Sequence, residues 1–232
     1  ADRLMEKLLL SEIAHCLNAE CPEEKVITEI STDTRNLPAG CLFIAIKGER
    51  FDGHAFIKQA IENGAAAAVS EYPVDGCPCI VVKNTRTALL KLAKYYRSKF
   101  NPVLVGITGS VGKTTTKEMI ALVLSEKYKT LKTQGNLNNE IGLPKTLFNL
   151  DSSYQAAVIE MGMSDFGEIE RLSNTAVPTI GVITNIGFSH IENLKSQEGI
   201  LKAKLEILSG MKSDAPLIVN GDDRYLAPLK LE

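Results

Sequence analysis

Apolar positions in the second half of the chain form continuous runs that predict parallel β-strands. The runs cover residues 103–108, 156–161, 179–184 and 216–220. Nearly every position in them is apolar, which is typical of strands covered by helices on both faces. Helical patterns separate the runs, and this rhythm predicts an α/β domain built on a parallel sheet. Its functional residues are expected at the carboxyl ends of the strands.

The first part of the chain repeats this alternation on a smaller scale. The expected elements are helices over 5–18 and 55–63 and strands over 26–32, 41–46, 65–69 and 79–82. A further helix is expected over 85–99. We therefore predict two domains, a small α/β domain over 1–84 and a larger parallel-sheet domain over 85–232.

The stretch 103–116, VLVGITGSVGKTTT, predicts a phosphate-binding loop between a strand and a helix. Its glycine spacing differs from the commonest form of this motif. Glycines let backbone N–H groups turn toward phosphate oxygens, Lys113 can reach the β- and γ-phosphates, and Thr114 can hold Mg²⁺. The ligand predicted by this motif is ATP. The helix is expected over 117–128, with its buried side formed by Met119, Ile120, Leu122, Val123 and Leu124.

Composition excludes few functions. The chain has 232 residues, 44% hydrophobic and 23% charged, which is ordinary for a soluble globular protein. A net charge of −2 gives no reason to expect nucleic acid as a partner. No apolar run is long enough to span a bilayer. The five cysteines form no metal-binding pattern, and their odd number argues against a disulfide framework, so we expect a cytoplasmic protein.

Two polar residues lie at or after the carboxyl ends of predicted strands. Glu160 ends the run AAVIEMG, where a carboxylate could position Mg²⁺ or water, or could simply be solvated. His190 lies in the loop after 179–184. A single loop histidine is more often a surface residue or a hydrogen-bonding partner, and Mg²⁺ prefers oxygen ligands.

Lys204 interrupts the apolar side of a predicted helix over 198–209. A lysine there either extends its ammonium group to solvent or is desolvated and shifted toward its neutral form. A neutral amine can react with CO₂ to form a carbamate, an anion that could support a metal. The loop 135–142 is rich in asparagine, which suits either a carbonyl-rich substrate or ordinary turn formation.

Taken together, these residues resemble the Mur ligases, the ATP-dependent amino-acid ligases of peptidoglycan precursor synthesis. The resemblance covers essentially the whole chain. It rests on DTRNLPAGCLFIAIKGERFDGH (33–54), GSVGKTTTKEM (109–119), GNLNNEIGLP (135–144), VIEMG (158–162) and HIENLKSQEGILKAK (190–204).

The resemblance implies a role for each matching residue. Lys204 would be a carbamylated lysine that supports the second Mg²⁺, held by Glu160 and His190, and Thr114 would hold the first. The residues implied to bind ATP are Thr108, Gly109, Ser110, Val111, Gly112, Lys113, Thr114 and Thr115. Asn138 and Asn139 would face the peptide of the substrate. The uridine-diphosphate-sugar site would be lined by Ser31, Thr32, Asp33, Thr34 and Arg35 and by the 47–54 loop, including Lys47, Gly48 and His54.

Within the family, the motifs are most similar to the branch that adds D-alanyl-D-alanine to UDP-N-acetylmuramoyl-tripeptide through an acyl phosphate. The alternatives are the branch that adds a diamino acid to the dipeptide precursor, and a non-catalytic nucleotide-binding module. The loop GNLNNEIGLP favours the first branch. We expect a monomer. Because family members are longer, this chain alone is expected to perform little or no ligation.

Overall fold

The computed structural model describes residues 5–49 and 51–229. The chain divides into two compact units, Ala1–Tyr96 and Arg97–Glu232. The division falls inside helix α3 (Thr85–Ser98), later in the chain than the expected position at residue 84. A helix that continues through a domain boundary leaves no change of composition to mark it.

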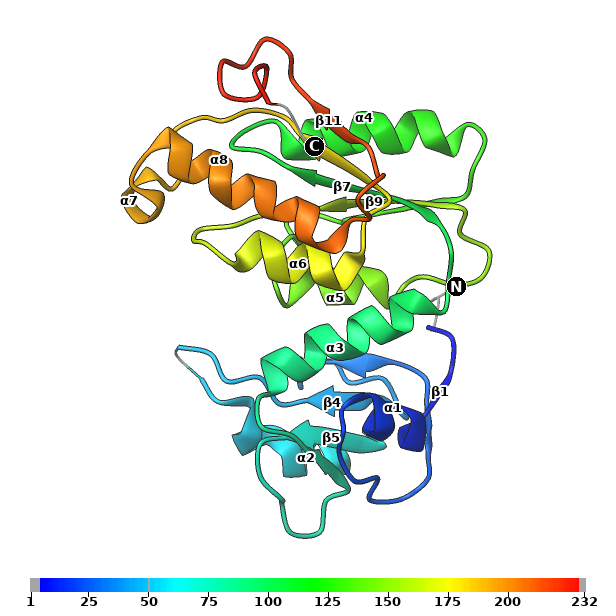
Figure 1. The fold of residues 1–232 in the computed structure, drawn as a ribbon. Helices are drawn as coiled ribbons and strands as arrows, with labels where there is room; N and C mark the ends of the chain where they lie inside the picture. The colour runs from blue at the N-terminus through cyan, green and yellow to red at the C-terminus, as the bar shows by residue number, and fades with distance from the viewer. Residues whose placement is uncertain (1–4, 50, 230–232) are drawn as a thin grey trace. The chain divides into compact units, whose positions relative to one another are not determined.

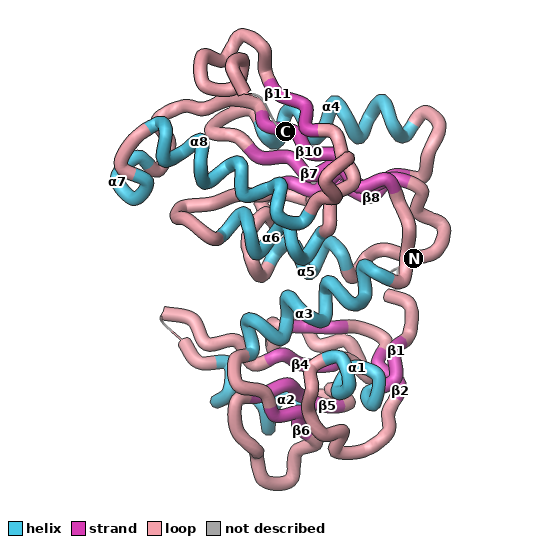
Figure 2. Tube along the Cα trace, viewed as in Figure 1, coloured by secondary structure: helices cyan, strands magenta, loops and turns pink. Residues whose placement is uncertain are grey.

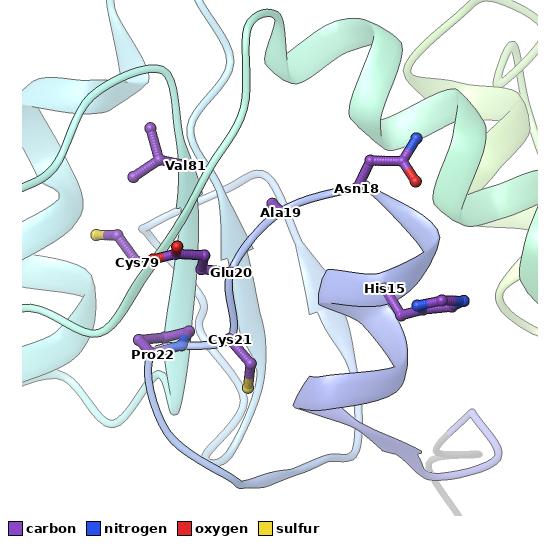
Figure 3. A pocket seen from close by; sticks show the side chains of 8 residues that line it. All are labelled: His15, Asn18, Ala19, Glu20, Cys21, Pro22, Cys79 and Val81. Atoms are coloured by element: carbon purple, nitrogen blue, oxygen red, sulfur yellow. The ribbon is translucent and has the colours of Figure 1, made fainter.

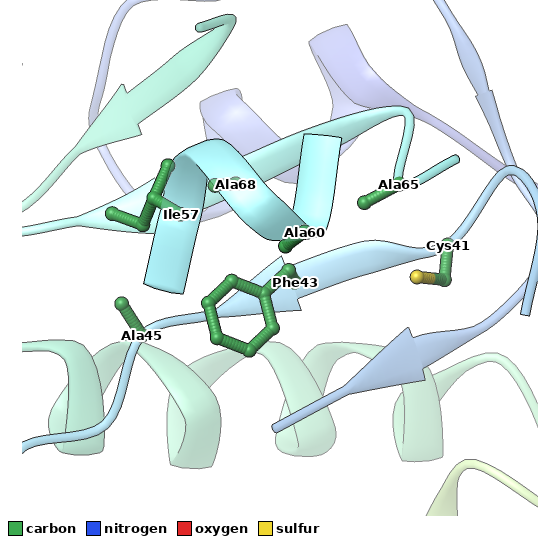
Figure 4. Close-up of a cluster of buried hydrophobic side chains, with 7 residues drawn as sticks. All are labelled: Cys41, Phe43, Ala45, Ile57, Ala60, Ala65 and Ala68. Carbon is green, nitrogen blue, oxygen red and sulfur yellow. The ribbon is translucent and has the colours of Figure 1, made fainter. Parts of the chain in front are cut away.

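The first unit is built on a parallel sheet with the strand order β3-β4-β5-β6. Its strands are β3 (Ile30–Ser31), β4 (Leu42–Ile44), β5 (Ala67–Ser70) and β6 (Cys79–Val81). The 3-10 helix η1 (Gly53–Phe56) leads into α2 (Ile57–Glu62). Figure 4 shows Ile57 and Ala60 of α2 beside Phe43 of β4, in an apolar cluster that fixes α2 against the sheet.

The beginning of the described chain differs from the expected helix over 5–18. Residues Leu8–Leu9 form strand β1, which pairs antiparallel with β2 (Val26–Ile27), and helix α1 covers only Leu10–Cys16. The Glu12 carboxylate accepts a hydrogen bond from the backbone N–H of Leu9, which closes the first turn of α1. The expected strand over 26–32 is likewise divided between β2 and β3, which pair with different partners.

The second unit contains the predicted parallel sheet, in the order β11-β10-β7-β9-β8 (Figures 1 and 2). Its strands are β7 (Val103–Thr108), β8 (Thr130–Lys132), β9 (Ala156–Glu160), β10 (Ile180–Ile183) and β11 (Leu217–Val219). Its helices are α4 (Lys113–Ser125), α5 (Gly142–Leu147), α6 (Glu168–Ala176), α7 (Ile191–Leu194), α8 (Gln197–Leu205) and the 3-10 helix η2 (Glu206–Gly210). Figure 1 shows α4 on one face of the sheet and α5 and α6 on the other.

Strand β8 was not predicted from the sequence. It is short, and of its three residues only Leu131 is buried, so it has neither an apolar run nor a clear alternation. Its pairing with β9 makes it a strand. This pairing places residue 133, directly after β8, beside the end of β9.

Helix α4 begins and packs differently from the prediction. It starts at Lys113, directly after the glycine loop, rather than at residue 117. Met119, Leu122 and Val123 of the expected buried side are exposed, at 64%, 69% and 71%, so that part of the prediction was wrong. Ile120 and Leu124 do pack against the sheet as expected, together with Ala121. The rotation of a helix about its axis is set by the strand and loop that it follows, and apolar residues lie on both sides of this helix.

Among the described residues, none of the helices has the length and apolar character required to cross a membrane.

Candidate active site

Residues after β10 hold the glycine loop that follows β7. The N–H of Ser110 donates to the carbonyl of Asn185 at 3.1 Å, and the N–H of Val111 donates to Asn185 Oδ1 at 3.1 Å. The hydroxyl of Thr184 donates to the carbonyl of Val111 at 2.7 Å. Because β7 and β10 are neighbours, this support comes from the carboxyl edge of the same sheet.

Two glycines shape the loop for different reasons. Gly109 has a φ of +154°, and a Cβ atom there would lie 1.8 Å from Thr184 Oγ1. Gly112 has a φ of +81° and open space around it, so the conformation of its backbone is what favours glycine. Gly112 lies directly before α4, whose first residue is Lys113.

Lys113 extends its side chain over the loop, where Nζ donates to the carbonyl of Gly109 at 2.9 Å. The first turn of α4 presents backbone N–H groups at the same place, which suits an anionic ligand. Thr115 is exposed on this turn. Thr108 is fully buried, and its hydroxyl has no hydrogen-bond partner within the described parts of the chain.

Glu160 ends β9 with a carboxylate that is almost completely buried, at 2% exposure. Oε2 accepts a hydrogen bond from Thr114 Oγ1 at 3.1 Å, and Oε1 accepts one from Asn138 Nδ2 at 2.9 Å. The site therefore places a hydroxyl oxygen and a carboxylate side by side next to the glycine loop. Oxygen ligands of this kind are those that Mg²⁺ prefers, so these residues fit the expected metal.

His190 is exposed, has a φ of +62° and directly precedes α7. Across residues 5–49 and 51–229, no group of three or more His, Cys, Asp or Glu side chains is placed to hold a metal ion. A metal site here would therefore need other oxygen donors, such as Thr114. The pairing of His190 with Glu160 on one ion stays a prediction.

Lys204 is buried on the inner side of α8, at 2% exposure, beside the buried residues Ile200 and Ala203. This confirms its predicted place on the apolar side of the helix. Desolvation, with a further contribution from the positive charge of Lys113, lowers the pKa of Lys204 to about 7. Lys204 thus lies within electrostatic reach of the phosphate-binding loop and is partly neutral at physiological pH.

The two asparagines expected at the substrate have separate structural contacts. Asn138 reaches Glu160, as described above. Asn139 accepts hydrogen bonds at Oδ1 from the N–H groups of Ile141 and Gly142, at 3.1 and 2.8 Å, and so supports the start of α5. Their contact with a peptide substrate stays a prediction.

The loop after β3 in the first unit contains a preformed ion pair. Arg35 donates from Nε and Nη2 to the carboxylate of Asp33, at 2.9 and 2.6 Å. Ser31 Oγ accepts the N–H of Asp33 at 3.1 Å. Thr32 and Thr34 are half-buried in the same turn. The guanidinium side chain is 88% exposed, so it remains open to a further anion.

His54 is not an open binding residue in this structure. Its side chain is 1% exposed, and the ring stacks on Tyr72, with the ring centroids 4.9 Å apart. Nε2 accepts the N–H of Glu71 at 3.0 Å, which makes Nδ1 the protonated nitrogen that donates to Asp52 at 2.6 Å. Both ring nitrogens are therefore occupied within the protein.

The loop over 47–54 is closed by its own backbone. Lys47 and Asp52 form an isolated β-bridge, and Gly48 donates its N–H to the carbonyl of Phe51 at 2.9 Å. The Lys47 side chain is exposed. Residue 50 of this expected binding loop lies outside the described residues.

Two residues of the site were missed by reasoning from the sequence. Thr184 supports the glycine loop, and Thr133 accepts the N–H of Glu160 at 2.9 Å. Their common signal is a polar residue at the carboxyl end of a strand. For Thr133 that signal was hidden because β8 itself was not recognised.

A separate pocket of about 770 Å³ lies beside α1 and β6 (Figure 3). Its lining includes His15, Asn18 and Cys21 near the end of α1 and Cys79 and Val81 of β6. None of the predicted site residues lines it. All five cysteines are free.

Comparison with known proteins identifies relatives of both units of the chain. The Mur ligase middle domain matches residues 107–232, and the domain described as "Mur ligase family, catalytic domain" matches residues 26–97. The UDP-N-acetylmuramoyl-tripeptide–D-alanyl-D-alanine ligase of Bacillus subtilis is 50% identical over 208 residues, which are 88% of this chain and 46% of that protein. The chain spans about half the length of the curated relatives that it matches.

Solved structures show the same similarity. MurF from Acinetobacter baumannii matches with a TM-score of 0.91 and 36% identity, over 96% of this chain and 51% of that one. MurF from Thermotoga maritima, in complex with ADP, matches with a TM-score of 0.81 and 36% identity, over 86% of this chain and 47% of that one. On the sequence match to both domains, this chain belongs to the Mur ligase family.

Proposed function

We propose that the complete protein containing this chain joins D-alanyl-D-alanine to UDP-N-acetylmuramoyl-tripeptide, with conversion of ATP to ADP and phosphate. The observation that supports this most directly is the Thr114–Glu160 contact beside a Mur-type phosphate loop. The relative with 50% identity bears the name of this activity. Because the reaction uses ATP and the cysteines are free, we place it in the cytoplasm.

In this proposal the second unit binds ATP and activates the tripeptide carboxylate. The glycine loop and Lys113 bind the phosphates. Thr114 holds one Mg²⁺, and Glu160 with His190 holds another. Bound Mg²⁺ supplies positive charge that stabilises the transferred phosphoryl group. Lys113 would give up its contact with Gly109 to reach a phosphate oxygen.

We further propose that Lys204 is carbamylated. The neutral amine attacks CO₂, an N–C bond forms as one C=O π bond breaks, and a proton is released, which leaves a buried carbamate anion in place of the neutral amine. The low pKa of about 7 supplies the neutral amine. With ¹³C-bicarbonate, the protein should show a carbamate carbon signal by NMR that is absent from Lys204→Met and present in Lys202→Met. A signal that survives Lys204→Met would place the carbamate elsewhere.

For the first unit we propose the uridine-diphosphate-sugar site. The exposed guanidinium of Arg35 is oriented by Asp33 and would meet the diphosphate. Thr32 and Thr34 offer hydroxyl groups from the same turn. Lys47 and Gly48 of the 47–54 loop would contact the sugar, whereas His54 would act by fixing Asp52 and Glu71.

Phosphate release by the complete gene product tests the proposed reaction. The assay supplies ATP, Mg²⁺ and UDP-N-acetylmuramoyl-tripeptide, with and without D-alanyl-D-alanine. Release that requires the dipeptide supports the proposal. Release only with the shorter precursor and a diamino acid would assign the protein to the other branch of the family. Absence of release with both substrates would leave a nucleotide-binding protein whose substrate is different.

A further inference from the structure

Lys117 is a buried cation on the side of α4 that faces the sheet. It is 1% exposed and lies one turn before Ala121, which packs on β7 and β9. Its Nζ donates to the carbonyl of Thr133 at 2.7 Å and lies 3.1 Å from the carboxylate of Glu118. Burying an ammonium group destabilises a protein unless such partners offset the loss of hydration. A charge-assisted hydrogen bond in this setting fixes the Thr133 carbonyl firmly.

Thr133 connects this lysine to Glu160. It is fully buried, and its N–H donates to the carbonyl of Val158 at 3.1 Å. Its hydroxyl accepts the N–H of Glu160 at 2.9 Å. The carbonyl of Thr133 accepts a hydrogen bond from Lys117, and its hydroxyl accepts one from the Glu160 N–H. A shift of Thr133 would therefore disturb both contacts.

The segment that begins at Thr133 also reaches the Glu160 carboxylate. Asn138 donates to Glu160 Oε1, and the carbonyl of Asn138 accepts the N–H of Gly162 at 2.8 Å. Both the backbone and the side chain of Glu160 are therefore held by the segment 133–138. Lys117 is the charged group that holds the start of this segment.

We propose that Lys117 is a positioning residue for Glu160, acting through Thr133. Its ammonium group contacts Thr133 and Glu118, and Thr133 in turn accepts the N–H of Glu160. Its part in magnesium binding rests on the function proposed above, whereas its part in holding Glu160 does not.

The first measurement needs no substrate. Hydrogen exchange of the Glu160 amide is followed by NMR or mass spectrometry in the complete gene product. Lys117→Met should accelerate this exchange about tenfold while the protein still melts cooperatively. Thr133→Val removes only the hydroxyl that accepts the amide and should do the same, and Thr133→Ser should match the natural protein. Lys132→Met is the matched control, because Lys132 also pairs with Glu118 but is partly exposed.

The second measurement concerns the metal. The Mg²⁺ concentration that supports half-maximal binding of a non-hydrolysable ATP analogue is measured by calorimetry. Loss of a residue that orients a metal ligand typically weakens metal binding about 10- to 100-fold. We expect the required Mg²⁺ concentration to rise at least about tenfold in Lys117→Met and Thr133→Val and to stay unchanged in Lys132→Met.

The proposal would be overturned if the Glu160 amide in either Lys117→Met or Thr133→Val exchanged at the same rate as in the natural protein. Loss of cooperative melting in Lys117→Met would overturn it too, because the lysine would then be needed for folding as a whole. Failure of dipeptide-dependent phosphate release in the natural protein would instead contradict the proposed function. The exchange result at Glu160 would stand in that case.

Discussion

The hydroxyl of Thr114 and the carboxylate of Glu160 lie 3.1 Å apart although 46 residues separate them in the chain. Thr114 is in the first turn of α4, which follows β7, and Glu160 ends β9, the neighbour of β7 in the sheet. Parallel strands bring their carboxyl ends to one edge, so a strand-end carboxylate meets a helix-start hydroxyl. This contact lies beside the phosphate loop.

Replacing Glu160 by Gln should remove the charge of this pair with little change in shape. We expect dipeptide-dependent phosphate release to fall by about a hundredfold or more, because the carboxylate would no longer hold Mg²⁺. The melting temperature should be preserved, since a buried neutral amide is less costly than a buried carboxylate. Glu126→Gln, at an exposed position after α4, is the control. Equal activity of the two variants would show that the Glu160 carboxylate does not hold Mg²⁺.

Lys204 should make stability depend on pH. Its pKa is about 7 in the folded protein and has a reference value of 10.5. Between these values the unfolded chain binds more protons than the folded protein, so this residue makes the protein more stable as pH rises. Below pH 7 the lysine is protonated in both states, and its burial is most costly.

Lys204→Met should therefore raise the melting temperature more at pH 6 than at pH 10. Melting is followed by circular dichroism in CO₂-free buffer, to keep the amine unmodified. Lys202→Met, on the exposed side of the same helix, should show no such difference. A gain that is equal at both pH values would mean that Lys204 is not desolvated.

The environment of His54 predicts a structural effect in the first unit. His54→Phe keeps a ring beside Tyr72 but leaves the Glu71 N–H without its acceptor. We expect a loss of about 1–3 kcal/mol in the free energy of unfolding, measured by urea denaturation. His15→Phe changes an exposed histidine and should be close to neutral. Loss of substrate binding in His54→Phe without loss of stability would instead indicate direct contact with the ligand.

The two loop glycines should differ in their tolerance of alanine. Gly109→Ala places a methyl group 1.8 Å from Thr184 Oγ1, so the loop must move and ADP binding should be lost. Gly112→Ala meets open space and costs about 1–2 kcal/mol of backbone strain. Calorimetry with ADP should show binding for Gly112→Ala and none for Gly109→Ala. The reverse order would show that the loop adopts another conformation in solution.

Local patterns in the sequence were enough to predict much of the fold. Strand β7 has the predicted bounds 103–108, because an apolar run that ends in a glycine loop needs no distant partner to be recognised. The place of Lys204 on the apolar side of its helix followed from helical spacing, whereas the choice between extension to solvent and burial was decided by the structure. The phosphate site could be predicted from the glycine loop because the residues of this motif are neighbours in the sequence.

Tertiary structure decided the features that depend on long-range pairing. Met119 and Val123 are exposed because the preceding loop sets the rotation of α4, whatever the helix's own apolar residues would favour. Strand β8 exists through its pairing with β9, and the contact from Thr133 to Glu160 follows from that register. Asn139 supports α5, and His54 is enclosed by Asp52, Glu71 and Tyr72. Sequence alone determined which residues could perform chemistry, and packing across the sheets decided which of them meet.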